Sequence, residues 1–248
     1  FAAENPAEVF DRVMEKNNTI QSAEIQSGVH SVILAKDVIP DGQMKVDMAM
    51  HAEMDMQDTT DLKYLAQVAS SILGQDSYSQ VFYTDGYYYV DSNGVKLKYP
   101  MPLEQIVSSV QTGVNTSNME SSYMKGISLN EVNGKRVLAY EANPKKLNKN
   151  VKEALGTVMN TLGTDVNLDM NIQEMKGAYV LDDNDYIIYM TNYIVYNMEV
   201  LDQPMTCITL METEVQNPGE PVVVTLPSTD GYEDLIGLYD GVIESEVE

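Results

Sequence analysis

Residues 44–56 read MKVDMAMHAEMDM, and every second position in this stretch is apolar. The apolar positions are Met44, Val46, Met48, Met50, Ala52, Met54 and Met56. Strict alternation is the period of a β-strand that has one apolar and one polar face. A strand through all of these positions would be about 43 Å long, whereas strands usually have about 5–6 residues. The stretch therefore predicts a long strand in a large sheet.

Most of the apolar positions in this stretch are methionine, whose unbranched side chain adapts to irregular shapes. Two interpretations stay open: the apolar face is ordinary packed core, or it is one wall of an apolar pocket. Candidate lining residues for such a pocket come from this stretch and from other predicted strands. They are Met44, Met48, Met50, Met54, Met56, Tyr83, Tyr88, Met170, Ile172 and Met190.

The composition excludes several classes of protein. The formal net charge is −23, so nucleic acid and bare anionic membrane are poor electrostatic partners. Cys207 is the single cysteine, which excludes an internal disulfide. No apolar run has the length of a membrane-spanning helix. The chain starts at Phe1, which suggests a mature or trimmed form whose targeting segment precedes it.

The first part of the chain predicts a helix followed by a hairpin. Asn5 as cap, Pro6 and Glu8 have the spacing of a helix N-terminus, and the apolar stripe behind them predicts a helix over about 6–16. Residues 23–33 alternate as a strand, and a turn centred between Pro40 and Asp41 would pair it with the methionine-rich strand. That register predicts the pairs Ile25–Met56, Ser27–Met54, Val29–Ala52, Ser31–Met50 and Ile33–Met48, with His30 opposite His51.

The rest of the chain predicts further helices and strands. Helical spacing predicts helices over 60–73, after Pro100 and Pro102, and after Asn143–Pro144. Asp85–Gly86 and Asn133–Gly134 predict two hairpins, with the pairs Tyr83–Tyr88, Val81–Val90, Leu129–Leu138, Ile127–Tyr140 and Glu131–Arg136. Strands are expected over 166–172, with a slip of phase near Glu174, and over 186–200, 205–215 and 222–226. Together these elements predict one α+β domain over 1–248, with a frayed acidic tail at about 240–248.

Three local phrases resemble a known group of proteins: residues 84–89 (TDGYYY), residues 177–182 (GAYVLD) and the methionine-rich strand. With the order of elements, they resemble the LolA/LprG/LppX-like envelope lipoproteins, in particular those of Gram-positive gut bacteria. The resemblance implies a long, curved antiparallel sheet, an incomplete and half-open barrel, that wraps amphipathic helices and encloses an apolar cavity. It also implies that acyl chains or lipoproteins are bound, and that a lipidated cysteine before Phe1 anchors an extracytoplasmic protein to the cell membrane.

The sequence contains no motif that would carry catalysis. There is no phosphate-binding glycine loop, HExxH or CxxC, and neither histidine lies in the context of a nucleophile elbow. His30, His51 and Glu53 would share one sheet face and could hold a metal, but two solvated strand histidines are the favoured interpretation. The run Asp182–Asp185 lacks the glycine and the distal glutamate of a calcium loop and predicts a turn. No metal or cofactor is therefore expected.

The sequence favours a non-enzymatic protein that binds or carries a lipid or other apolar ligand at the bacterial cell envelope. The alternative is an envelope interaction or sensor module with a filled core that binds a protein partner. A continuous apolar cavity would separate the first from the second. A third interpretation, a hydrolase, would require a polar cleft with paired titratable groups.

Overall fold

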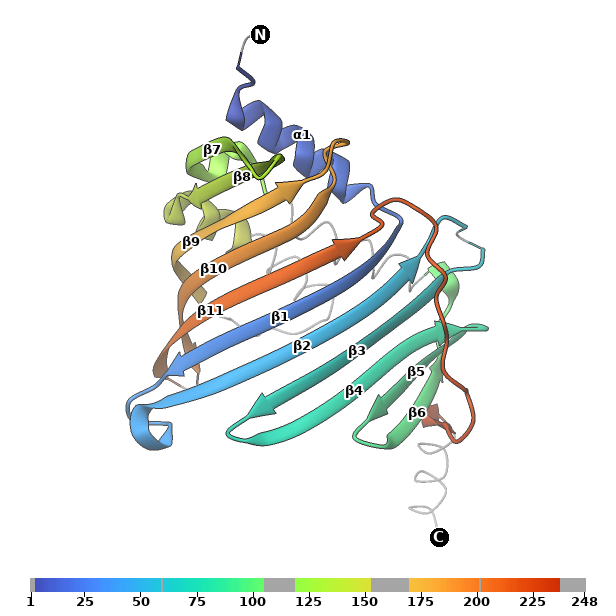
Figure 1. Ribbon diagram of the computed structural model, residues 1–248. Helices are drawn as coiled ribbons and strands as arrows, with labels where there is room; N and C mark the ends of the chain where they lie inside the picture. The colour runs from blue at the N-terminus through green and yellow to red at the C-terminus, as the bar shows by residue number, and fades with distance from the viewer. Residues whose placement is uncertain (1–2, 59, 105–118, 153–169, 201, 237–248) are drawn as a thin grey trace.

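The computed structural model describes residues 3–58, 60–104, 119–152, 170–200 and 202–236 (Figure 1). Its helical elements include α1 (Pro6–Asn18), η1 (Pro40–Gly42) and η2 (Ser121–Tyr123), and residues 144–152 are helical as well. Its strands are β1 (Ser22–Leu34), β2 (Gln43–Asp55), β3 (Lys63–Ile72), β4 (Gln75–Thr84), β5 (Tyr87–Ser92), β6 (Val95–Pro100), β7 (Met124–Val132), β8 (Lys135–Ala142), β9 (Met170–Leu181), β10 (Ile187–Val200), β11 (Gln203–Gln216) and β12 (Glu233–Asp234). None of the described helices is long and apolar enough to span a membrane.

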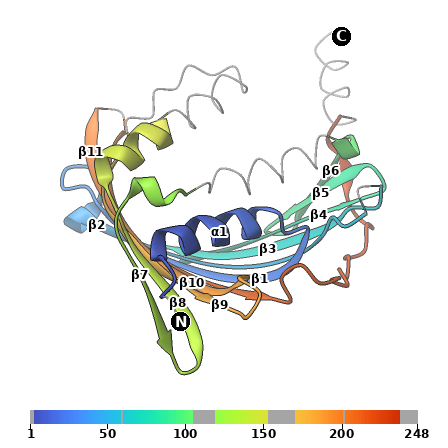
Figure 2. The ribbon, with the colours of Figure 1, turned by 90° about the horizontal axis from the view of Figure 1, so that it is seen from above.

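All of these strands lie in one sheet, in the order β12-β6-β5-β4-β3-β2-β1-β11-β10-β9-β8-β7. Every pairing is antiparallel except the short contact of β12 with β6. The sheet curves strongly without closing on itself, and α1 lies on its concave side (Figure 2). The predicted fold class, α+β with a long, curved and half-open antiparallel sheet that wraps amphipathic helices, is confirmed.

The N-terminal helix forms as the sequence predicts and packs against one end of the concave face. The Asn5 side chain accepts hydrogen bonds from the backbone N–H groups of Ala7 and Glu8, which satisfies donors at the helix start. The apolar stripe of α1 packs against β8, β9 and β10 in one cluster. Its members include Val9, Phe10, Val13, Met14, Leu138, Tyr140, Tyr179 and Ile187.

An ion pair network ties the exposed side of α1 to the sheet. The Asp185 carboxylate accepts hydrogen bonds from Arg12 Nε and Arg136 Nη2, each at 2.8 Å. Burial acts to raise the pKa of Asp185, but the hydrogen bonds and charges of the two arginines outweigh it and hold the pKa below its usual range.

The β1–β2 register differs from the prediction by four residues. Ile25 lies opposite Ala52, so paired residue numbers sum to 77, whereas the predicted pair Ile25–Met56 sums to 81. Residues 35–42 form a longer connection than the predicted tight turn, because the backbone N–H of Ala35 bonds to the carbonyl of Gly42 and η1 follows inside the loop. An even shift leaves each side chain on its predicted face but exchanges all cross-strand partners. His30 consequently lies opposite Asp47 and not opposite His51.

We expect cysteines at Val29 and Met48 to cross-link under mild oxidation in a Cys207→Ala background. The two residues are directly opposed, which brings their Cβ atoms to about 4.5–5.5 Å, close to disulfide range. The matched pair Val29→Cys and Ala52→Cys tests the register predicted from the sequence and should stay reduced. Gel mobility with and without reductant measures both, and preferential linkage of the second pair would contradict the register of the structure.

Residues 60–73 do not form the predicted helix. Most of them form β3, between β2 and β4, and Gly74 is the second residue of a hairpin turn and not a helix stop. Leu73 and Gly74 both have positive φ angles, 53° and 74°, as a tight two-residue hairpin turn requires. The sequence-based prediction was wrong because both faces of β3 carry apolar residues, which hides the alternation of a strand.

Other sequence-based predictions are confirmed. Asp85–Gly86 and Asn133–Gly134 are hairpin turns, with all five predicted pairs in register. Asn143 caps a helix that starts at residue 144, and the predicted slip near Glu174 is a bulge between Ile172 and Glu174. Residues 222–226 form no strand, which corrects that prediction. The predictions over 105–118, 153–169 and 237–248 lie outside the described residues.

The segment after β11 crosses the convex side of the sheet toward β6 (Figure 1). Its residues Val224 and Tyr232 are buried against Leu65, Phe82 and Tyr89. Phe82 stacks on Tyr89 with ring centroids 4.6 Å apart, and Tyr232 meets both rings edge-on. Contact of Val222, Val224 and Leu226 with the convex face of the sheet explains why residues 222–226 are apolar without being a strand.

Candidate functional site

The concave face carries the predicted apolar residues of β2. Met44, Val46, Met48 and Met50, here called the methionine strip, lie opposite Ile33, Ser31, Val29 and Ser27 of β1. The members of the strip are partly open to solvent, and Met48 is 39% exposed. Met48 is exposed and its three neighbours are half-buried, and apolar side chains that stay open to solvent side by side are typical of sites that contact a ligand or partner.

Packed clusters lie on the concave face on either side of the strip. At one end, Met54, Met56 and Tyr83 are buried together with Leu62, and Tyr88 packs against them. Burial, followed by the neighbouring Tyr64 and Tyr99, raises the pKa of Tyr88 to about 12. At the α1 end, Ile172 is buried and Met190 packs against the cluster, while Met170 is half-buried opposite Met198. Apart from Met170, the predicted lining residues thus fall into two packed groups and an open strip between them.

Hydroxyl groups line the concave face beside the strip, between β1 and β11. Ser27 bonds to Thr213 at 2.8 Å and Ser31 to Thr209 at 2.9 Å, each across the two strands. Because these hydroxyls satisfy one another, they add little polarity to the face. Sequence reasoning did not identify them, since β1 and β11 are neighbours that lie far apart in the chain.

Two polar atoms near α1 make no hydrogen bond of normal geometry with the described residues, although one of them, the Tyr140 hydroxyl, lies close to the Tyr179 side chain. They are the Tyr140 hydroxyl and the Asn192 side-chain oxygen, and both are buried. Gly177 lies opposite both residues, on the neighbouring strands. Burial raises the pKa of Tyr140, so its hydroxyl stays neutral and keeps its proton as a donor.

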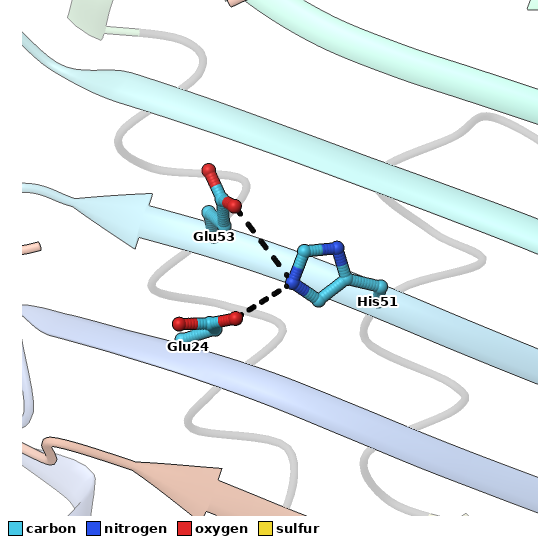
Figure 3. Close-up of side chains that lie close together, drawn as sticks. All are labelled: Glu24, His51 and Glu53. Atoms are coloured by element: carbon cyan, nitrogen blue, oxygen red, sulfur yellow. Dashed lines mark hydrogen bonds and ion pairs between the residues drawn. The ribbon is translucent and has the colours of Figure 1, made fainter. Parts of the chain in front are cut away.

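The convex face holds a cluster that contains one histidine and two carboxylates (Figure 3). His51 Nε2 lies 3.0 Å from Glu24 Oε1 and 3.8 Å from Glu53 Oε1. The predicted grouping of His51 with Glu53 is present, but Glu24 takes the place of His30. His30 instead pairs with Asp47, at 2.7 Å between Nδ1 and Oδ1, where both side chains are 58% exposed.

Close to this cluster the convex face is hollowed. Gly28, Ala49 and Ala69 are small residues on three neighbouring strands, and they leave a depression of about 510 Å³. His51 and Glu214 stand among its walls. The depression is open to solvent and touches Met50, but the alternation of β2 directs the side chains of the methionine strip to the other side of the sheet.

Comparison with solved structures finds similar chains, and two of them are mycobacterial proteins. LprF from Mycobacterium bovis has 10% sequence identity and a TM-score of 0.39, with 90% of this chain and 97% of that chain covered. The lipoprotein LppX from Mycobacterium tuberculosis has 10% identity and a TM-score of 0.38, with 90% and 100% covered.

Sequence comparison gives a family and no characterised relative. Among curated proteins, no sequence matches this chain. The model of a family of unknown function, DUF6612, matches residues 5–227, which is most of the 248 residues. The chain therefore belongs to DUF6612.

Proposed function

We propose that this protein binds or carries a lipid or another apolar ligand on its concave face, without enzymatic activity, at the bacterial cell envelope. The observation that carries the proposal is the partly exposed methionine strip on the concave face. The opposite face of β2 presents Lys45, Asp47 and His51, so the apolar surface is confined to one side.

The physical basis of binding is burial of apolar surface. Each 100 Å² of apolar surface removed from water contributes about 2.5 kcal/mol. Methionine suits a surface that must accept chains of variable shape, because its side chain is flexible and its sulfur is polarisable. A curved sheet adds contact area, since strands on both sides of the strip turn toward the same ligand.

The cell-envelope location belongs to the same proposal and is supported by the resemblance of the sequence to envelope lipoproteins. A lipid anchor before Phe1 would hold the protein at the membrane from which it takes its ligand. An envelope protein partner is compatible with this location. Mass spectrometry of an organic extract of the purified protein tests the proposal directly, because a bound lipid should co-purify.

The Met50→Trp substitution tests whether the methionine strip is a surface that binds a ligand or part of a packed core. Met50 is half-buried between Ser27 and Val68 on the neighbouring strands. On an open surface the indole would occupy ligand space, and losing about 55 Å² of apolar contact corresponds to roughly tenfold weaker binding. We expect tenfold weaker uptake of a fluorescent fatty-acid probe by the delipidated protein, with an unchanged melting temperature.

The control is Ala49→Trp, which places the same ring on the convex face of the same strand and should leave probe uptake unchanged. Wild-type protein that takes up no probe after delipidation would refute the proposal. So would a Met50→Trp variant that loses several degrees of melting temperature while its folded fraction binds probe normally, since overpacked core behaves in that way.

A further inference from the structure

The histidine–carboxylate cluster on the convex face has an arrangement that its strands dictate. Glu24 of β1 and Glu53 of β2 are directly opposed, so their side chains leave the sheet side by side. His51 precedes Glu53 by two residues and therefore shares its face. In Figure 3 the imidazole lies beside both carboxylates, with its Nε2 atom toward them.

Two facing carboxylates need a positive partner. Like charges directly opposite each other on a sheet are destabilising, and these side chains are only 29% and 17% exposed, so water screens them incompletely. Glu214 adds to the negative field, because it pairs with Gln26 and Gln26 pairs with His51. No lysine or arginine forms an ion pair with Glu24 or Glu53 among the described residues.

The distances fit a small metal ion. In a tetrahedral zinc site with bonds of about 2.0–2.2 Å, neighbouring ligand atoms lie about 3.3 Å apart. The distances from His51 Nε2 to the two carboxylate oxygens, 3.0 and 3.8 Å, lie on either side of that value. One ligand atom from each of the three residues lies within 4.8 Å of the other two. Small side-chain rotations would complete the geometry.

A contact from outside the cluster orients one of the ligands. The backbone N–H of Thr225 donates to Glu53 Oε2 at 3.2 Å, which leaves Oε1 as the oxygen nearer to His51. Hydrogen bonds of this kind fix the direction of metal ligands. Thr225 belongs to the segment that crosses the convex side of the sheet, so an ion here would connect β1, β2 and that segment.

We propose that Glu24, His51 and Glu53 form a binding site for a divalent cation of the zinc class. One imidazole nitrogen with two carboxylate oxygens suits Zn²⁺ and similar ions, whereas Ca²⁺ and Mg²⁺ prefer oxygen ligands alone. Three protein ligands leave one coordination position for water or a further ligand. The site is on the side of β2 opposite the methionine strip. A test of metal binding is therefore independent of the test of ligand binding on the concave face.

Titration with ZnCl₂ tests the site, by calorimetry and by thermal unfolding of the metal-stripped protein. We expect one saturable equivalent of Zn²⁺ and a rise in melting temperature, since an ion that binds only the folded state stabilises it. His51→Ala should abolish both effects. Glu53→Gln keeps the shape of the ligand and the contact with Thr225, and should weaken binding at least tenfold. Circular dichroism verifies that both variants are folded.

The matched control is His30→Ala, which removes the other histidine–carboxylate pair of the convex face. This variant should bind Zn²⁺ as the wild type does, and Ca²⁺ should produce no saturable effect in any of these proteins. Absence of saturable Zn²⁺ binding by the wild type would overturn the proposal and leave His51 as the ion-pair partner of the two glutamates. Equal binding by all variants would overturn it too, because it would reflect the acidic surface as a whole.

Discussion

Replacing Phe10 with alanine is expected to cost about 3–5 kcal/mol of unfolding free energy, as for other buried aromatic residues. Phe10 is fully buried at the centre of the contact between α1 and the sheet. Its ring meets Tyr140 edge-on with centroids 5.9 Å apart and lies 6.2 Å from Tyr179. Alanine would leave a cavity that these neighbours cannot fill, since each is held in its strand. A loss of this size approaches the whole stability of many domains.

Urea unfolding followed by circular dichroism measures the effect through the midpoint and the slope. Phe10→Leu retains most of the volume and should cost less than half as much. Glu15→Ala, on the exposed side of the same helix, should change stability by no more than about 0.5 kcal/mol. If Phe10→Ala were as mild as Glu15→Ala, the helix would not be packed on the concave face as described.

Residues close together in the sequence were enough to predict those strands, helix starts and turns that do not depend on contacts with distant segments. The long alternating stretch of β2, the cap at Asn5 and the hairpins at Asp85–Gly86 and Asn133–Gly134 all follow from residues close together in the chain. In both hairpins the turn residues have positive φ angles, which Asp or Asn followed by Gly adopts readily. Registers next to such turns are determined by the turn itself, and those predictions were correct.

Prediction failed where a distant segment decides the structure. Leu73–Gly74 is a hairpin turn of the same kind, but leucine gives no signal for a positive φ. The neighbouring β3 carries Leu65 on the convex face of the sheet, where the segment after β11 buries it. A strand covered on both faces loses its alternation, and the helical spacing of residues 60–73 was accidental. The β1–β2 register failed for a related reason, because a loop rather than a tight turn joins the strands.

The two faces of β2 show how far the candidate sites were predictable. Alternation alone placed Met44, Met48 and Met50 on one face, and the shift of four residues did not change that. The same shift changed the cross-strand partner of His51 from His30 to Gln26, which brings His51 close to Glu24. An error in register does not affect the prediction of a site whose residues all belong to one strand. It does affect the prediction of a site whose residues come from two strands. The cluster of Glu24, His51 and Glu53 was therefore predicted only in part.

Gly177→Ala is expected to cost about 3 kcal/mol, the upper end of the usual penalty for overpacking. A Cβ atom on Gly177 would lie 2.7 Å from Tyr140 Oη and 2.9 Å from Tyr140 Cζ, and it would also collide with the carbonyl oxygen of Thr191. Neither neighbour can move easily, because Thr191 of β10 is paired with Ala178 of β9 and the Tyr140 ring stacks on Tyr179 with centroids 5.2 Å apart. Glycine is thus required here for close approach and not for an unusual φ angle.

The matched control for this substitution is Gly126→Ala on β7, where an added Cβ meets no atom within 4 Å. There the lost freedom of the unfolded chain should leave stability unchanged or raise it by about 0.4–1 kcal/mol. Because both substitutions add one methyl group to a strand glycine, the difference between their urea midpoints isolates the steric effect at Gly177. Similar midpoints for the two variants would show that Tyr140 does not occupy the space above Gly177. A large loss confined to Gly177→Ala would establish that β8, β9 and β10 are packed beneath α1 as tightly as the structure requires.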